Sequence, residues 1–230
     1  MPAEEDVTER VVVITGAAAV PRAAVDAIGT ASFILAVDGG LDHARNAGLT
    51  PHRLIGDLDS ISEDGLRWAT EHIDVVRHPA AKDETDTQLA LRHAVEAGTA
   101  HVTMIGGGDR LDHTLAALGA LAAPQLAELD HLDAWWDGQH LVVLHGPRCA
   151  ALELPRGSTV SVIALAAPAL VSIGGVRWPL DHHELAPLDG LGVSNEVVDG
   201  ASIEAHRGVV AVFDHPIHDT PTPQQEEPPA

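Results

Sequence analysis

Residues 85–122 read TDTQLALRHAVEAGTAHVTMIGGGDRLDHTLAALGALA and predict a helix, a strand and a second helix in succession. Apolar residues recur at helical spacing until Gly98, which predicts that the first helix spans 85–97. The apolar run 102–105 is typical of a strand and ends in three glycines. In the next helix, apolar residues at intervals of four, three and four predict a packed face. That face contains Leu111, Leu115, Leu118 and Ala122.

The same order of strand and helix extends toward the N-terminus. Segments 21–28 and 62–71 are typical of helices, the second with Ser62 as its N-cap. Short apolar runs predict four more strands, centred on 11–14, 33–37, 54–55 and 75–76. This alternation predicts a mainly parallel sheet flanked by helices, an α/β domain over residues 1–130. Ligands of such sheets bind beyond the carboxyl ends of the strands.

After residue 130 the pattern becomes almost entirely β. Residues 132–144 predict a hairpin around Asp137-Gly138. Further short strands are expected at 150–154, 159–165, 170–178, 202–205 and 209–213. We therefore predict a C-terminal all-β domain, sandwich-like or barrel-like, over 131–213. Residues 214–230 contain five prolines and two glutamates and predict a disordered acidic tail.

The composition excludes several classes of protein. The formal net charge of −21 disfavours nucleic acid as a partner. One cysteine, Cys149, excludes a disulfide framework and a CxxC metal site, and it suits a reducing cytoplasm. The acidic start lacks the basic and apolar pattern of a signal peptide. The uncharged stretch 157–176 is interrupted by serine, proline and glycine, so we expect strands there and no membrane partner.

Common nucleotide and hydrolase motifs are also missing. The single lysine, Lys82, precedes Asp83 and therefore does not form a P-loop. After Gly106 and Gly108, the third glycine of a dinucleotide fingerprint would fall at Leu111. No HExxH or GxSxG motif occurs.

Asp57 and Asp59 follow the predicted strand 54–55 at positions i and i+2. Carboxylates at this spacing can project to the same side of an extended chain. Two of them about 4 Å apart repel by roughly 4 kcal/mol at an effective dielectric constant near 20. A cation between them relieves that repulsion, and oxygen-only ligands suit Mg²⁺. The alternative interpretation is a solvated, aspartate-rich turn.

Two further clusters lie at predicted helix starts. Asp86 is expected to face the sheet, or alternatively to act as a capping acid behind an N-cap at Thr85 or Asp83. Lys82 could contact a phosphate or pair with a neighbouring acid at the surface. At 106–113, Gly107 and Gly108 let backbone N–H groups approach a phosphate, and Arg110 suits bidentate phosphate contacts. The alternative there is a turn with a surface pair between Arg110 and Asp112.

In the β-rich half, Trp178 and the pair Ser194-Asn195 stand out. Trp178 could be an ordinary core or rim aromatic, and Ser194-Asn195 could be a turn. The fifteen histidines show no reliable metal-ligand spacing.

Taken in order, these segments resemble the thiamine pyrophosphokinase family. The matching segments are Asp38-Gly39-Gly40, 56–60 (GDLDS), 83–86 (DETD), 106–113 (GGGDRLDH), 175–178 (GVRW) and Ser194-Asn195. The resemblance implies an α/β domain followed by a β-rich domain, in a homodimer. It also implies transfer of pyrophosphate from ATP to the hydroxyl of thiamine, with release of AMP.

The resemblance implies a role for each matching residue. Asp57, Asp59 and Asp86 would hold Mg²⁺ against the ATP phosphates, with Asp38 and Asp112 lining the same catalytic site. The phosphates would contact Lys82, Thr85, Gly107, Gly108 and Arg110. The thiamine pocket would include Trp178, Ser194 and Asn195, and would be completed across the dimer interface.

Two positions depart from the family pattern. Asp109 stands where a glycine is common, and Ala117 stands where an asparagine is common. An acid beside the phosphates would weaken ATP binding.

Other functions stay open at this stage. One is a pyrophosphokinase of the same fold that acts on another acceptor, such as a hydroxymethylpterin. Another is a non-catalytic nucleotide-binding or scaffold relative. The general base is also open, because Asp38 or a metal-site aspartate could accept the hydroxyl proton.

Overall fold

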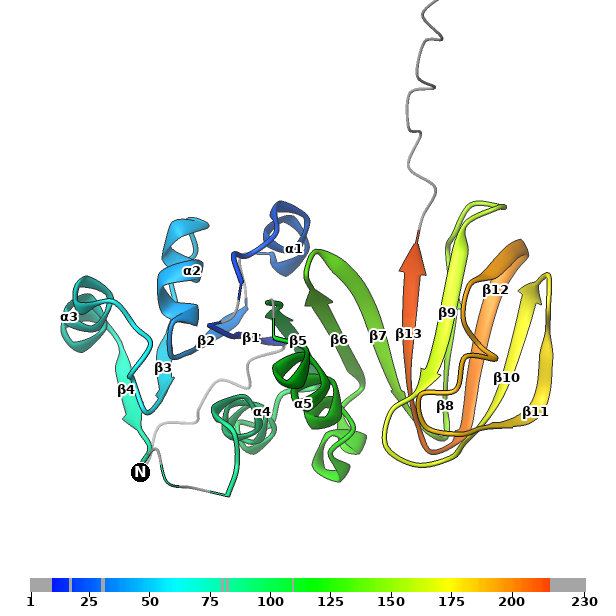
Figure 1. Cartoon of the computed structure of the whole chain (residues 1–230). Coiled ribbons are helices and arrows are strands. Elements are labelled where there is room, and N and C mark those ends of the chain that lie inside the picture. Colours follow the sequence, from blue (N-terminus) through cyan, green and yellow to red (C-terminus); the bar gives the residue numbers. More distant parts are fainter. Residues whose placement is uncertain are drawn as a thin grey trace, which may run out of the picture.

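The computed structural model describes residues 10–16, 18–29, 32–79, 81, 83–108 and 110–215 (Figure 1). Its first part alternates strands and helices, which confirms the predicted α/β class. The elements are β1 (Arg10–Ile14), α1 (Arg22–Ile28), β2 (Phe33–Val37), α2 (Gly40–Asn46), β3 (Arg53–Gly56), α3 (Glu63–His72), β4 (Asp74–Arg77), α4 (Asp86–Glu96), β5 (His101–Gly106) and α5 (Leu111–Leu121).

Six neighbouring strands form the parallel part of the sheet, in the order β4-β3-β2-β1-β5-β6, where β6 is His131–Trp136. The chain adds β2, β3 and β4 on one side of β1, and then β5 and β6 on the other. The strand order therefore reverses between β1 and β5. In an open α/β sheet, such a reversal leaves a crevice at the carboxyl ends of the strands.

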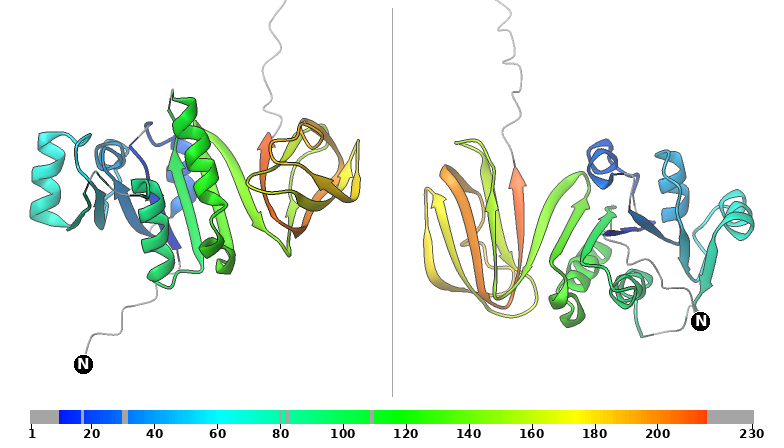
Figure 2. Two further views of the ribbon diagram at one scale, coloured as in Figure 1. Left: turned by 60° about the horizontal axis from the view of Figure 1, so that its bottom comes forward. Right: turned by 180° about the vertical axis from the view of Figure 1, so that it is seen from behind.

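Helices cover both faces of this sheet (Figure 2). In β1, Val12 and Ile14 lie in one hydrophobic cluster with residues of α1 and α2. Val11 and Val13 lie in the opposite cluster, with residues of α4 and α5. Because the strand is buried on both sides, its sequence is a continuous apolar run and does not alternate.

The predicted packed face of α5 is only partly confirmed, because Leu118 packs against the core while two of its leucines are exposed. The helix buries Ala117, Ala120 and Leu121, whereas Leu111 and Leu115 are 70% and 48% exposed. Two adjacent faces of this helix are apolar, so periodicity alone does not choose between them. The face with small side chains is the one that packs, which leaves two leucines in solvent.

The short helix α2 is missing from the sequence-based prediction. It begins at Gly40, directly after Gly39, with no side-chain cap. Gly40 packs so closely on β1 that a Cβ atom there would collide with the carbonyl oxygen of Ile14. Seven residues without a capping side chain give little signal, and here close backbone packing fixes the helix.

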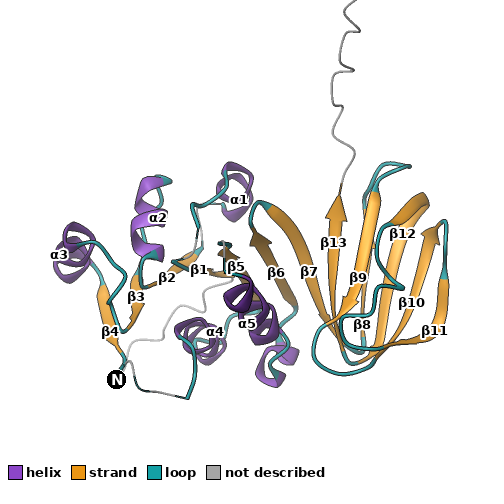
Figure 3. Ribbon diagram, in the orientation of Figure 1, coloured by secondary structure: helices purple, strands orange, loops and turns teal. Residues whose placement is uncertain are grey.

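The predicted hairpin is confirmed, and it connects the two parts of the molecule (Figure 3). Strand β6 pairs in parallel with β5 and antiparallel with β7 (Gln139–His145), through a turn at Asp137-Gly138. Leu132 and Leu141 of this hairpin pack in the same core as α4 and α5. A predicted boundary at residue 130 thus falls just before a strand that extends the parallel sheet, and the domain limits stay a prediction.

The remaining strands form an antiparallel sandwich around a second core. They are β8 (Arg148–Leu152), β9 (Thr159–Ala164), β10 (Ala169–Val176), β11 (Leu180–Leu185), β12 (Asn195–Arg207) and β13 (Val209–His215). A short 3-10 helix, η1 (Pro124–Glu128), lies earlier in the chain, between α5 and β6. One layer contains β7, β13 and β9, and β12 pairs with β8 and β10 in the other. Sequence reasoning missed β11 and the first half of β12. The predicted tail, 214–230, begins too early, because Asp214 and His215 end β13 and pair with β9. The rest of that tail lies outside the described residues.

Among the described residues, no helix is long and apolar enough to cross a membrane. The expected strands within 157–176 are confirmed as β9 and β10.

A charged cluster connects the hairpin to the last strand. His140 of β7 contacts Asp214 of β13 through Nδ1 at 3.1 Å, and Asp133 of β6 through Nε2 at 3.5 Å. Burial of the ring lowers the pKa of His140, but the two carboxylates outweigh burial and raise that pKa to about 9. The protonated ring is therefore favoured in the folded state.

Replacing His140 with glutamine is expected to destabilise the protein in a pH-dependent way. A histidine whose pKa is raised on folding contributes its full stabilisation below its unfolded pKa, about 6.5, and loses it as the pH rises through the folded value. Urea unfolding of both proteins at pH 6, 8 and 10 should show a difference that is largest at pH 6 and smallest at pH 10. A difference independent of pH would mean that the charge of His140 has no such role.

Candidate active site

Residues at the carboxyl ends of the parallel strands line a pocket of about 430 Å³. It collects residues from the loops after β1, β2 and β3, from the end of β6, from the start of α4 and from the first two turns of α5. Its lining includes Thr15, Gly16, Asp38, Asp57, Asp59, Ser60, Thr85, Asp86, Thr87, His113, Ala116, Ala117 and Trp136. Four of the five predicted catalytic carboxylates therefore meet in one place, at the sheet edge where they were expected.

The loop after β2 holds Asp38 against the loop after β3. Asp38 has a φ of 47°, and its Oδ1 accepts a hydrogen bond from the N–H of Leu58 at 3.0 Å. Its carboxylate lies on Gly56, where a Cβ atom would collide with it. The glycine before the two aspartates is thus needed for close approach between the two loops.

The alternation within Asp57-Leu58-Asp59 follows from burial. Leu58 is 8% exposed and packs in a hydrophobic cluster with residues of α3, whereas the carboxylates on either side line the pocket. Asp57 Oδ1 also accepts a hydrogen bond from the N–H of Asp59 at 3.2 Å. The spacing i and i+2 therefore brings both acids to one pocket, as predicted.

Asp42 of α2 anchors the far end of this loop, a role that the sequence did not indicate. Its two carboxylate oxygens accept hydrogen bonds from the N–H and the hydroxyl of Ser62, both at 2.8 Å. Ser62 in turn caps α3 by accepting from the N–H of Gly65 at 2.9 Å. This chain of bonds fixes the acidic loop between two helices.

At α4, Thr85 is the N-cap, which settles the choice between Thr85 and Asp83. Its hydroxyl accepts from the N–H of Gln88 at 3.2 Å, and Gln88 Oε1 accepts from the N–H of Thr85 at 2.8 Å. This capping box fixes the first turn, so that Thr85, Asp86 and Thr87 line the pocket.

The pocket concentrates negative charge. Burial raises the pKa of Asp38 to about 6; the Leu58 N–H opposes this, and the charges of Asp86, Asp57 and Asp59 add to it. Within the described ranges, no three His, Cys, Asp or Glu side chains are grouped closely enough to hold a metal ion as they stand. The four carboxylates of the pocket nevertheless offer only oxygen donors, and their mutual repulsion favours a hard cation such as Mg²⁺. The chemistry of the pocket therefore fits magnesium.

Replacing Asp38 with asparagine is expected to stabilise the metal-free protein at neutral pH. An acid whose pKa is raised on folding binds protons more tightly in the folded state, so stability falls as the pH rises from about 4 to 6. Asparagine tolerates the φ of 47° and can accept the same bond from Leu58. Urea unfolding without divalent metal should show the variant more stable at pH 7.5 and similar to the wild type at pH 4. A less stable variant at pH 7.5 would contradict the conclusion that the ionised form of Asp38 is unfavourable in the folded protein.

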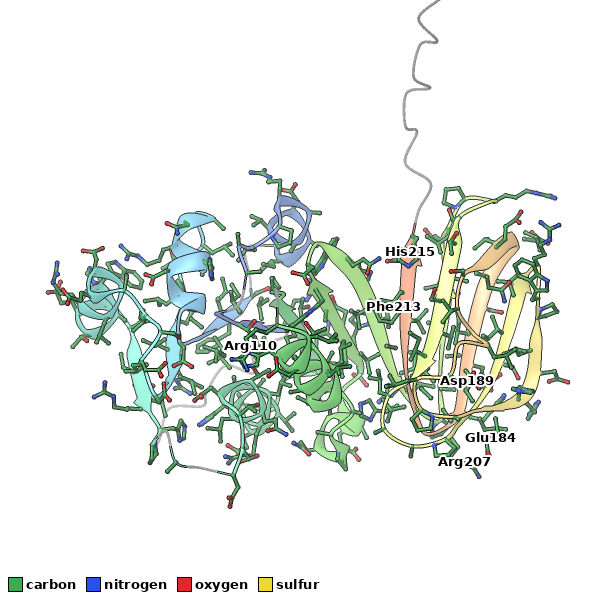
Figure 4. All side chains as sticks on the ribbon, in the orientation of Figure 1. Arg110, Glu184, Asp189, Arg207, Phe213 and His215 are labelled. Carbon is green, nitrogen blue, oxygen red and sulfur yellow. The ribbon has the colours of Figure 1, made fainter. Side chains whose placement is uncertain are left out.

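The predicted phosphate-binding residues are not all in this pocket. Arg110 pairs with Asp112 through two hydrogen bonds, of 3.2 and 2.6 Å, and both side chains are exposed. Figure 4 labels Arg110 beside α5. This pairing lowers the pKa of Asp112. Neither residue lines the pocket, so the structure shows the surface pair that was the alternative interpretation. Lys82 and Asp109 lie outside the described residues.

Gly107 and Gly108 directly follow β5 and are not among the residues that line the pocket. Their φ values of 152° and 138° require glycine, and the N–H of Gly108 donates to Asp137 Oδ1 at 2.8 Å. Sequence reasoning missed Thr15 and Trp136, which line the pocket. His113, quoted in the segment 106–113 without a role, lines it too. Trp136 was not predicted as a site residue because residues 132–136 were assigned to the β-rich half. That strand is in fact part of the parallel sheet, and its carboxyl end lies at the pocket.

The three residues predicted to bind thiamine form a separate unit in the sandwich. The side chain of Asn195 accepts from the N–H of Trp178 at 3.0 Å and donates to its carbonyl oxygen at 2.7 Å. Ser194 has a φ of 59° and donates its N–H to Ser161 Oγ at 3.0 Å. Trp178 itself is 58% exposed. Since β10 and β11 lie at the opposite end of the strand order from β3, this unit does not line the acidic pocket of the same chain.

Two family models match successive parts of the chain. The first, described as "Thiamin pyrophosphokinase, catalytic domain", matches residues 25–130. The second, "Thiamin pyrophosphokinase, vitamin B1 binding domain", matches residues 148–210. The first range contains most of the acidic pocket, and the second contains Trp178, Ser194 and Asn195. No curated protein matches the chain.

Several solved structures share the fold. A thiamine pyrophosphokinase from Bacillus subtilis has a TM-score of 0.76 at 22% identity, covering 91% of this chain and 100% of its own. One from Geobacillus thermodenitrificans has a TM-score of 0.73 at 24% identity, covering 91% and 99%. The yeast enzyme has a TM-score of 0.66 at 14% identity, covering 92% and 90%. The similarity thus extends over both the α/β part and the sandwich.

Proposed function

The chain belongs to the thiamin pyrophosphokinase family, and from that premise we propose that it transfers pyrophosphate from ATP to the hydroxyl of thiamine, with Mg²⁺ as cofactor. The products are thiamine pyrophosphate and AMP. The acidic pocket is the observation that carries this proposal. Asp38, Asp57, Asp59 and Asp86 converge at the reversal of strand order, where a magnesium–nucleotide complex would be bound by oxygen donors.

In this proposal Asp57, Asp59 and Asp86 hold the magnesium ion, which neutralises charge on the phosphates when bound. The hydroxyl oxygen of thiamine forms a bond to the β-phosphorus of ATP. The bond from that phosphorus to the oxygen shared with the α-phosphate breaks, and AMP leaves. Such a transfer depends on positioning and charge neutralisation more than on covalent help from the protein.

Asp38 is the proposed acceptor of the hydroxyl proton. Burial is the main cause that raises the pKa of Asp38, to about 6 in the metal-free pocket, and it makes this side chain a stronger base than an ordinary aspartate. The hydrogen bond from Leu58 fixes its orientation toward the pocket. Full turnover in the Asp38→Asn variant would exclude this role.

Thiamine is proposed to bind at Trp178, Ser194 and Asn195. Two hydrogen bonds to Asn195 fix the backbone of Trp178, and its exposed ring offers a flat surface for a cationic aromatic ligand. Because this unit lies far from the acidic pocket of its own chain, the proposal includes a homodimer in which one copy supplies this surface to the other. A cytoplasmic location is also proposed, supported by the free, exposed Cys149.

The proposal is tested by incubating the purified protein with ATP, Mg²⁺ and thiamine and measuring AMP, ADP and thiamine pyrophosphate by chromatography. A parallel reaction replaces thiamine with a hydroxymethylpterin. AMP and thiamine pyrophosphate should form in equal amounts, and only with thiamine and Mg²⁺. Pterin pyrophosphate would indicate the other acceptor. Binding of Mg²⁺–ATP without either product would favour a non-catalytic module.

A further inference from the structure

The turn between β6 and β7 contacts the glycine loop, residues 106–108, which begins at the last residue of β5. The N–H of Asp137 donates to the carbonyl oxygen of Gly106 at 3.0 Å. The carboxylate of Asp137 accepts from the N–H of Gly108 at 2.8 Å. It also lies on Gly107, where a Cβ atom would collide with it. One residue therefore contacts all three glycines in succession.

The neighbouring Trp136 extends this contact to α5. Its indole ring packs on Gly106, where a Cβ atom would come within 2.5 Å of it. Its Nε1 donates to the hydroxyl of Thr114 in the first turn of α5, at 3.2 Å. The turn thus holds the end of β5 and the start of α5, on both sides of the glycine loop.

Turn formation alone does not account for the side chain of Asp137. Asp137 and Gly138 have φ values of 49° and 79°, as a two-residue turn with left-handed residues requires. Aspartate is common there because it tolerates this conformation. In this turn, however, the carboxylate leaves its own segment and binds a backbone N–H 29 residues away.

We propose that Asp137 is a positioning residue for the nucleotide phosphates. Its carboxylate oxygen accepts from the N–H of Gly108, which fixes the glycine-specific backbone of Gly107 and Gly108. This inference rests on the proposed function, because the loop's ligand is taken to be the phosphate chain of ATP. The carboxylate acts as a hydrogen-bond acceptor; its negative charge gives no help near phosphates.

Two variants of Asp137 distinguish its role as a hydrogen-bond acceptor from the effect of its negative charge. In Asp137→Asn, the amide oxygen can still accept from Gly108, and asparagine tolerates a positive φ. Asp137→Gly removes the acceptor and suits the left-handed backbone, so the turn can still form. A matched control is His182→Gly, which also introduces glycine at an exposed residue of positive φ, in β11.

Asp137→Gly is expected to raise the KM for ATP about tenfold, the effect of losing one hydrogen bond. The KM for thiamine, the melting temperature and the His182→Gly control should stay close to wild type. Asp137→Asn should keep the KM for ATP within about twofold of wild type. An unchanged KM for ATP in Asp137→Gly would overturn the proposal. An equal loss in both Asp137 variants would also overturn it, because charge would then matter and not the acceptor.

Amide hydrogen exchange separates this inference from the proposed function. The N–H of Gly108 should exchange slowly in the wild type and in Asp137→Asn, and faster in Asp137→Gly, with or without ATP turnover. If the wild type made no AMP but showed this pattern, the proposed function would fail and the contact between Asp137 and Gly108 would stand. Equal exchange in all three proteins would refute the contact itself.

Discussion

Replacing Asp59 with asparagine is expected to lower kcat/KM for Mg²⁺–ATP by about 10²–10³, the loss typical of one charge-stabilising group in a transition state. Asp59 is exposed and lines the acidic pocket. Asparagine has nearly the same size as aspartate, so folding should be unaffected. The measurement is steady-state kinetics at several Mg²⁺ concentrations, with the melting temperature of each protein.

Asp64→Asn is the matched control for this prediction. Asp64 is an exposed acid in the first turn of α3, paired with Arg45 and Arg67 at 3.5 and 3.3 Å. Exposed ion pairs contribute little to stability, and Asp64 lies outside the pocket lining. Activity should therefore stay at the wild-type level. Wild-type turnover in Asp59→Asn, or an equal loss in Asp64→Asn, would contradict a magnesium site at Asp59.

Replacing Gly40 with alanine is expected to destabilise the fold by about 3 kcal/mol or more, because the new methyl group would meet backbone atoms of β1 and not a flexible side chain. For a chain of this size, that corresponds to a drop of roughly 6–12 °C in melting temperature. Gly40 opens α2 directly after Asp38-Gly39. Any shift of α2 would therefore also move Asp38, and activity should fall with stability.

Replacing Gly119 with alanine is expected to have the opposite effect on stability. Gly119 lies within α5, and nothing would lie within 4 Å of an added Cβ atom there. Alanine at this helical position should stabilise the protein by about 0.5–1 kcal/mol. Thermal and urea unfolding of both variants provide the comparison. Similar stabilities for Gly40→Ala and Gly119→Ala would contradict the close packing of α2 on β1.

Much of the α/β fold could be predicted because local and long-range signals agree there. Helix α3 has its N-cap at Ser62, α4 has a capping box at Thr85, and the buried positions of β1 and β2 are all apolar. The exposed leucines of α5 were misjudged because periodicity does not identify which apolar face packs. Strand β11 was missed because its residues 181–184 are exposed, so its sequence carries no apolar alternation.

The acidic part of the site was predictable for a physical reason. Parallel strands end at one edge, so polar residues after β2 and β3 must lie near each other. Contacts that depend on tertiary placement were not predictable. Asp42 binds a loop 20 residues later, and Asp137 binds one 29 residues earlier. The contact of Arg110 was also not predictable from its motif. Its side chain was predicted to bind phosphate, but in the structure it pairs with Asp112 of the same segment.

The most direct test of the proposed reaction uses ATP labelled at its β-phosphorus, with Mg²⁺ and thiamine. Transfer of an intact pyrophosphate group predicts that the label appears in thiamine pyrophosphate, with an equal amount of unlabelled AMP, and that both products are lost in Asp59→Asn. Label retained in ADP, with thiamine monophosphate as the other product, would contradict pyrophosphate transfer at this site.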